Sequence, residues 1–140
     1  MSNNQEFRHE LKYIVSTAEQ VLIKNRITGL MPIDSHTGEK GRYNVRSLYF
    51  DDYYNRCFYE NENGTDPREK FRIRIYNHST ERIMLECKRK EKGKTLKSAC
   101  QLTVEQAKTL MRGEYLRDIA SQPPVLQKLT LLMMKNRMRL

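Results

Sequence analysis

Two neighbouring stretches of the chain alternate between basic and apolar residues, and this alternation constrains the fold more than any other feature. Lys70, Arg72 and Arg74 are separated by Phe71, Ile73 and Ile75. Successive side chains of a β-strand point to opposite faces, so a strand over residues 70–76 would have one basic and one apolar face. The pattern recurs over residues 83–90, where Ile83, Leu85 and Cys87 alternate with Glu86, Lys88 and Lys90. The two stretches are predicted to form a hairpin through residues 77–80.

The rest of the chain predicts an α+β fold with an antiparallel sheet and flanking helices. Further strands are expected over residues 7–15, 43–51 and 96–102. Ser16-x-x-Glu19 and Thr103-x-x-Gln106 are capping boxes, and each predicts the start of a helix. A short helix or a turn is expected over residues 52–60, and a short helix over residues 114–121. A last helix is expected to begin at the Pro123-Pro124 pair. The 140 residues fit a single domain, residues 1–140.

The net charge indicates an anionic partner. The chain carries a formal charge of +9, and the stretch from Arg68 to Lys97 holds 11 basic and 4 acidic residues, which is +7 of that total. Such a charge suits nucleic acid, anionic lipid or phosphates. One face of an antiparallel sheet is often charged simply because it faces water. Three strands that share the pattern favour a binding site over that simpler explanation.

Phosphate is the anion that these residue types suit best. Arginine offers a planar fork of donors that matches phosphate oxygens, and lysine offers a compact point charge. Closely spaced cations repel each other, so the cluster costs free energy unless a polyanion offsets it. Glu10 and Glu86 lie among the basic positions, and we expect them either to offset part of this charge or to hold a divalent metal beside the phosphates.

The cysteines and the hydropathy suggest where the protein resides. The three cysteines match no zinc-site spacing, and their odd number together with the lack of a signal peptide predicts a reducing, cytoplasmic location. No apolar run approaches the roughly 18 residues of a membrane span, so none is expected.

Three motifs carry a resemblance to a known family. They read S-L-Y-F-D at residues 47–51, R-E-K-F-R-I-R-I-Y at residues 68–76 and L-E-C-K-R-K at residues 85–90. In this order and spacing they resemble the VTC (vacuolar transporter chaperone) domain. This domain is the polyphosphate polymerase branch of the triphosphate tunnel, or CYTH-like, superfamily. The resemblance runs from about residue 7 to residue 113.

The resemblance implies a fold, a reaction and a set of site residues. The sheet would form part of an antiparallel barrel whose tunnel is lined by basic side chains. The domain would transfer the terminal phosphoryl group of ATP to a polyphosphate chain with Mn²⁺ or Mg²⁺ as cofactor. Arg72, Arg74 and Lys88 would be the catalytic residues, and Glu10 and Glu86 the candidate metal ligands. Among the further phosphate-binding residues, Lys12 would match the first-strand lysine of the tunnel, and Lys94 or Lys97 a later basic position. Lys70 and Lys90 are further phosphate-binding candidates because they share the basic faces of the strands.

Two departures from the family pattern qualify this expectation. Triphosphate-hydrolysing relatives begin with Glu-x-Glu-x-Lys, but this chain has Arg8-x-Glu10-x-Lys12, which weakens a hydrolase interpretation. The chain also ends at Leu140, where the family domain continues. We therefore expect the N-terminal portion of a truncated VTC-like domain, with open sheet edges that favour self-association and with uncertain activity of its own. The alternatives are a non-catalytic triphosphate- or polyphosphate-binding module and, less favoured, a nucleic-acid-binding domain.

Overall fold

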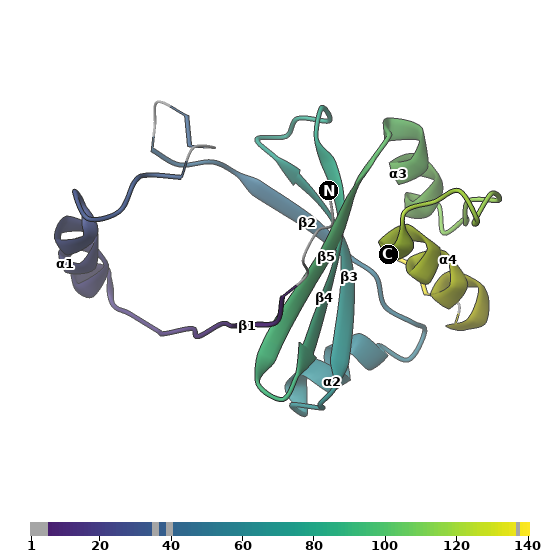
Figure 1. Ribbon diagram of the computed structural model, residues 1–140, viewed down its shortest axis with the longest axis horizontal. Helices are drawn as coiled ribbons and strands as arrows, with labels where there is room; N and C mark the ends of the chain where they lie inside the picture. The colour runs from purple at the N-terminus through teal and green to yellow at the C-terminus, as the bar shows by residue number, and fades with distance from the viewer. Residues whose placement is uncertain (1–5, 35–36, 39–40, 137) are drawn as a thin grey trace. The chain divides into compact units, whose positions relative to one another are not determined.

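The computed structural model describes residues 6–34, 37–38, 41–136 and 138–140 (Figure 1). The chain divides into two compact units, one formed by Glu10–Asn44 and the other by Met1–His9 together with Val45–Leu140. The expectation of a single domain over the whole chain stays a prediction. None of the described helices has the length and apolar character needed to cross a bilayer.

The smaller unit contains helix α1, Thr17–Ile27, which begins as the capping box predicts. The Ser16 hydroxyl accepts a hydrogen bond from the Glu19 amide at 3.3 Å, and the Glu19 carboxylate accepts one from the Ser16 amide at 2.7 Å. These two bonds satisfy amides that have no partner within the helix. No residue of α1 is buried, so local capping rather than core packing defines this helix.

The larger unit is built on a five-stranded antiparallel sheet with the order β1-β5-β4-β3-β2. Its strands are β1 (Arg8–His9), β2 (Val45–Tyr49), β3 (Arg68–Tyr76), β4 (Ile83–Glu91) and β5 (Lys94–Leu102). The α+β class and the antiparallel sheet are therefore confirmed. Within the described residues the sheet is open, with β1 and β2 at its edges, so the barrel and the self-association expected from open edges remain predictions.

Two turns fix the register of the long strands. Lys92 and Gly93 join β4 to β5, and both have positive φ. A two-residue hairpin turn requires positive φ values of this kind if it is to match the twist of its strands. The Lys92 amide also donates a 2.8 Å hydrogen bond to the Asp66 carboxylate. Because the turn occupies only these two residues, β5 begins at Lys94 rather than at the expected residue 96. The predicted hairpin between β3 and β4 is confirmed.

Two predicted elements are wrong in extent or in kind. The strand expected over residues 7–15 shrinks to β1, because His9 pairs with Lys94, the first residue of β5, and β5 offers no partner beyond it. The helix expected over residues 114–121 is absent; this segment forms isolated turns instead. A segment this short has too few helical hydrogen bonds to offset nucleation.

Helices α3 (Val104–Met111) and α4 (Pro124–Asn136) pack on one face of the sheet and bury its apolar side chains. Figure 1 shows both helices on the same side of the long strands. Thr103 caps α3 as its capping box predicts, and Pro124 opens α4, where a missing amide costs nothing. The buried side chains include Phe71 and Leu85 of the sheet and Leu110, Leu126 and Leu129 of the helices. The short helix α2 (Arg56–Glu62) packs against β3.

Candidate functional site

The strand register gathers basic side chains on the face of the sheet opposite the core. Lys70 lies opposite Lys88, and Lys88 lies opposite Lys97, so three lysines form one row across β3, β4 and β5. Residues opposite each other in an antiparallel pair share a face. Seven cations and one carboxylate on these three strands form what we call the basic face, with a formal net charge of +6: Arg68, Lys70, Arg72, Arg74, Glu86, Lys88, Lys90 and Lys97.

The lysine row is electrostatically unfavourable as a purely structural feature. Directly opposite side chains in a sheet have Cβ atoms about 4.5–5.5 Å apart, and like charges at that spacing are destabilising. Lys97 is the most exposed of the three, and Lys70 and Lys88 are half-buried. A multivalent anion that contacts all three would offset the repulsion, which is a reason to regard this row as part of a binding surface.

Glu86 lies at the centre of the basic face and links three strands. Its Oε2 atom accepts a hydrogen bond from Arg72 Nε at 2.7 Å and forms ion pairs with Arg72 Nη2 at 2.6 Å and with Arg74 Nη1 at 3.9 Å. Its Oε1 atom is 2.6 Å from Lys97 Nζ. The Glu86 residue is only 2% exposed, whereas the Arg72 side chain is 18% exposed. A buried carboxylate therefore holds cations whose outer edges still reach the solvent.

Burial and the neighbouring cations have opposite effects on the pKa of Glu86. Burial on its own raises the pKa of the carboxyl group, but hydrogen bonds from Lys97 and Arg72 and their charges outweigh it and hold the pKa below its usual value. Burial likewise lowers the pKa of Arg72, and its bonds to Tyr49 and Glu86 reverse that effect. The carboxylate and the guanidinium are therefore both charged at neutral pH.

Strand β2 adds neutral polar groups at the border of the basic face. Ser47 lies opposite Arg74 and accepts a 3.0 Å hydrogen bond from its Nε atom. Tyr49 lies opposite Arg72, accepts a 3.1 Å hydrogen bond from its Nη1 atom and has its ring centroid 5.9 Å from the guanidinium carbon. Both residues belong to the S-L-Y-F-D motif, and neither was predicted as a site residue, although their spacing of two indicates that they share one face of a strand.

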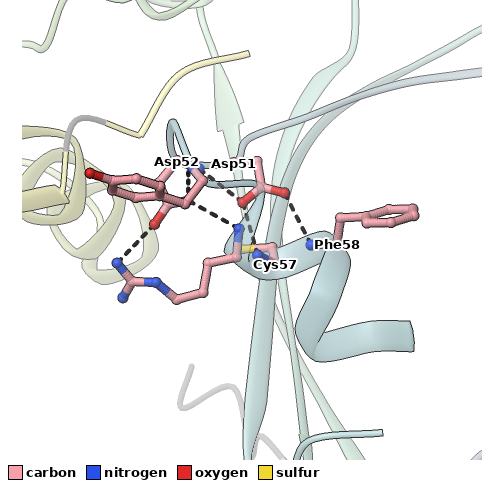
Figure 2. Close-up of polar contacts among 6 residues, drawn as sticks. Asp51, Asp52, Cys57 and Phe58 are labelled. Atoms are coloured by element: carbon pink, nitrogen blue, oxygen red, sulfur yellow. Dashed lines mark hydrogen bonds and ion pairs between the residues drawn. The ribbon is translucent and has the colours of Figure 1, made fainter. Parts of the chain in front are cut away.

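The end of the same motif anchors helix α2 rather than a ligand. Asp51 accepts hydrogen bonds from the amides of Asp52, Cys57 and Phe58 (Figure 2). The three donor–acceptor distances are 2.8–3.0 Å. Asp52 accepts bonds from the amides of Tyr54 and Arg56, both at 3.0 Å. Aspartates that precede a helix commonly satisfy its first amides in this way. This role was not predicted from the sequence, although two aspartates that precede a short helix are typical of such capping.

The expected metal site does not fit the residues that the structure describes. Both oxygens of Glu86 are already engaged by cations, and a cation beside them would oppose a metal ion. No group of three histidine, cysteine, aspartate or glutamate side chains in the described part of the chain has a geometry suited to a metal ion. The Mn²⁺ or Mg²⁺ cofactor therefore stays a prediction from the resemblance, and we derive no step through it.

Of the remaining predicted site residues, Lys94 is placed on the other face, Glu10 and Lys12 lie in the other unit, and Lys90 is on the basic face. Lys94 lies opposite Glu91, an odd number of residues from Lys97, so its side chain belongs to the other face. Glu10 and Lys12 belong to the smaller unit, and their proposed roles stay predictions. Lys90 lies opposite Arg68 on the basic face, as predicted.

A separate cavity of about 330 Å³ opens on the apolar side of the sheet, beside α2 and α4. Phe71 and Leu132 line it, together with three acidic and three basic side chains. Glu69 binds Lys128 at 2.6 Å, and Asp52 binds Arg56 at 2.8 Å. Since these charges already neutralise one another, the cavity is a weaker candidate for an anion site than the basic face.

The open antiparallel sheet, with one cationic face and one apolar face covered by helices, defines an α+β protein with a strongly basic surface. Within that class the chain belongs to the VTC domain family, because the family model matches residues 7–139. This match confirms the resemblance and supports a function related to polyphosphate. A search of curated proteins found no match.

Proposed function

We propose that the basic face binds the phosphate groups of a nucleoside triphosphate and of inorganic polyphosphate. The proposed reaction is transfer of the terminal phosphoryl group of ATP to a polyphosphate chain. The observation that carries this proposal is the row of opposed lysines beside Arg72 and Arg74, seven cations with a single buried carboxylate. A chain of phosphates matches such a surface because its charges repeat along a line, as the cations do across the strands.

The proposed chemistry needs little from the protein beyond position and charge. An oxygen of the polyphosphate end forms a bond to the γ-phosphorus of ATP, the bond from that phosphorus to the bridging oxygen breaks, and ADP leaves. Phosphoryl transfer of this kind depends mainly on alignment and on neutralised charge. Arg72 and Arg74 would hold the transferred group, and Lys88 would neutralise a neighbouring phosphate.

Binding is the first test, with tripolyphosphate as the probe in isothermal titration calorimetry. The Arg72→Ala plus Arg74→Ala variant removes two charge-assisted contacts, which should weaken binding about 100-fold. Arg112→Ala plus Arg117→Ala removes the same charge from outside the basic face and serves as the matched control. Equal binding by the two double variants would contradict the assignment of the site.

Catalysis is tested separately by incubating the protein with ATP, Mn²⁺ and a short polyphosphate primer, and by following chain length on gels. Chain growth that depends on Arg72 and Arg74 is the expected result. Tripolyphosphate binding without any turnover of ATP would favour a non-catalytic phosphate-binding module. A preference for single-stranded RNA over polyphosphate in competition would favour a nucleic-acid-binding domain, with exposed Tyr49 as a stacking surface.

A further inference from the structure

Glu86 is out of place on a surface that is proposed to bind anions. It is the only carboxylate that strands β3–β5 place on the basic face, and it lies in the middle of that face rather than at its rim. A negative charge there repels a bound phosphate, so charge alone would favour a neutral residue. The contacts of Glu86 indicate what compensates for this repulsion.

Each oxygen of Glu86 serves a different neighbouring strand. Oε2 holds Arg72 of β3 through two nitrogen atoms, at 2.7 Å and 2.6 Å, and Oε1 holds Lys97 of β5 at 2.6 Å. Glu86 itself belongs to β4, which lies between those strands. The two cations would otherwise repel each other and point apart into the solvent. One carboxylate therefore draws the guanidinium and the ammonium toward the same point.

We propose that Glu86 is a positioning residue that assembles Arg72 and Lys97 into one phosphate-binding group before the ligand arrives. This inference rests on the proposed function of the basic face. The ordering cost of two long side chains is then met during folding rather than during binding, which is how a preorganised site gains affinity. Glu86 acts through its cations and is not itself a contact to phosphate.

Glutamine cannot replace Glu86 in this role, although it has almost the same shape. A glutamine side chain has one acceptor oxygen and one NH₂ group that only donates. Whichever way the amide turns, either Arg72 or Lys97 loses its acceptor and faces another donor. Aspartate keeps the charge but is one methylene shorter, so it cannot reach both cations with the same geometry.

Two explanations of Glu86 predict opposite signs for the same substitution. If Glu86 only reduces the positive charge of the face, Glu86→Gln adds one unit of net charge and should tighten tripolyphosphate binding. If Glu86 positions the cations, the same variant should bind about tenfold more weakly, despite its extra positive charge. Glu69→Gln is the matched control, because Glu69 also binds a lysine at 2.6 Å but lies on the opposite face. Its binding should stay within about twofold of the unsubstituted protein.

The experiment measures tripolyphosphate affinity by calorimetry for the unsubstituted protein, Glu86→Gln, Glu86→Asp and Glu69→Gln, at two salt concentrations. A second readout is the Arg72 Nε–H resonance in NMR spectra, assigned by its absence from Arg72→Lys. In the unsubstituted protein it should exchange slowly with water because it donates to Glu86, and in Glu86→Gln it should exchange fast. A general loss of stability would not single out this resonance.

The outcomes separate this inference from the function on which it rests. If the unsubstituted protein does not bind tripolyphosphate, the proposed function fails and the positioning role fails with it. If the unsubstituted protein binds and Glu86→Gln binds equally well or more tightly, only the positioning role is overturned. If Glu86→Gln does not fold, Glu86→Asp provides the test, because it leaves the net charge unchanged. It should bind tripolyphosphate more weakly than the unsubstituted protein, and equal binding would overturn the inference.

Discussion

Replacement of Asp52 by alanine should destabilise the larger unit through helix α2. The Asp52 side chain is 4% exposed, and its Oδ1 atom accepts the amides of Tyr54 and Arg56, both at 3.0 Å. Its Oδ2 atom forms a 2.8 Å ion pair with Arg56, whose side chain is 55% exposed. Alanine removes all three contacts at once and offers the two amides no other acceptor.

The size of the expected loss in the free energy of unfolding follows from these contacts. Each backbone hydrogen bond contributes about 1 kcal/mol, and the exposed ion pair contributes about 0.5 kcal/mol. Asp52→Ala should therefore lower the free energy of unfolding by about 2–3 kcal/mol. For a chain of this length that corresponds to a decrease of about 6–12 °C in Tm. Asp52→Asn keeps the acceptor oxygen and loses the charge, so it should cost only about 1 kcal/mol.

The effect of Asp52→Asn should also depend on pH. The Arg56 amide bond lowers the pKa of Asp52, burial opposes that shift, and the Arg56 charge and the Tyr54 amide reinforce it. A pKa that is lower in the folded state means stabilisation that is present at neutral pH and lost as the pH falls through the folded pKa. The gap in stability between the unsubstituted protein and Asp52→Asn should therefore close below about pH 4.

Thermal unfolding followed by circular dichroism between pH 3 and pH 8 tests this set of expectations. Glu105→Ala is the control, because Glu105 forms a comparable ion pair with Lys108 but is 80% exposed. That variant should change stability by no more than about 0.5 kcal/mol. Equal destabilisation by Asp52→Ala and Asp52→Asn, or a gap that does not vary with pH, would refute the capping explanation.

Three further outcomes are expected. Lys70→Met removes a charge opposite Lys88, so without phosphate it should raise Tm by about 1–4 °C, and it should reduce the rise in Tm that tripolyphosphate causes. Thr95→Val should stabilise the protein by about 1 kcal/mol in urea unfolding, because the buried Thr95 hydroxyl has no hydrogen-bond partner among the described residues; a loss of stability would contradict this. Burial raises the pKa of the Cys87 thiol to about 12, so mass spectrometry should find iodoacetamide labelling at pH 8 slow in the folded protein and fast in urea.

The sequence was sufficient for the features that depend on local pattern. Alternation over residues 70–76 and 83–90 predicted two strands and their two chemically different faces, and both capping boxes predicted the first turns of α1 and α3. These features are set by side chains within a few positions of each other. The same local logic correctly put Arg72, Arg74 and Lys88 on one face.

The predictions that were wrong or incomplete concern features that depend on residues distant in the chain. The first strand is short because its partner strand β5 begins at Lys94, which pairs with His9. The sequence of residues 7–15 contains nothing that indicates where the partner strand begins. The role of Glu86 depends on the register of β4 with its neighbours, which places Arg72 of β3 opposite it and Lys97 of β5 diagonal to it. Two turns, rather than the strand itself, fix that register. Sequence alone therefore left Glu86 as either a counter-charge or a metal ligand.

The charge of the basic face also affects the choice of buffer for experiments on this protein. The seven cations of the basic face are offset only in part by Glu86 when no anion is bound, and any multivalent anion in the solution relieves the remaining repulsion. Phosphate, sulfate or citrate buffers should thus act as weak ligands that stabilise the fold and compete with the tested phosphates. Buffer composition is therefore an experimental variable for this protein, and affinities measured in chloride and in phosphate should not be compared directly.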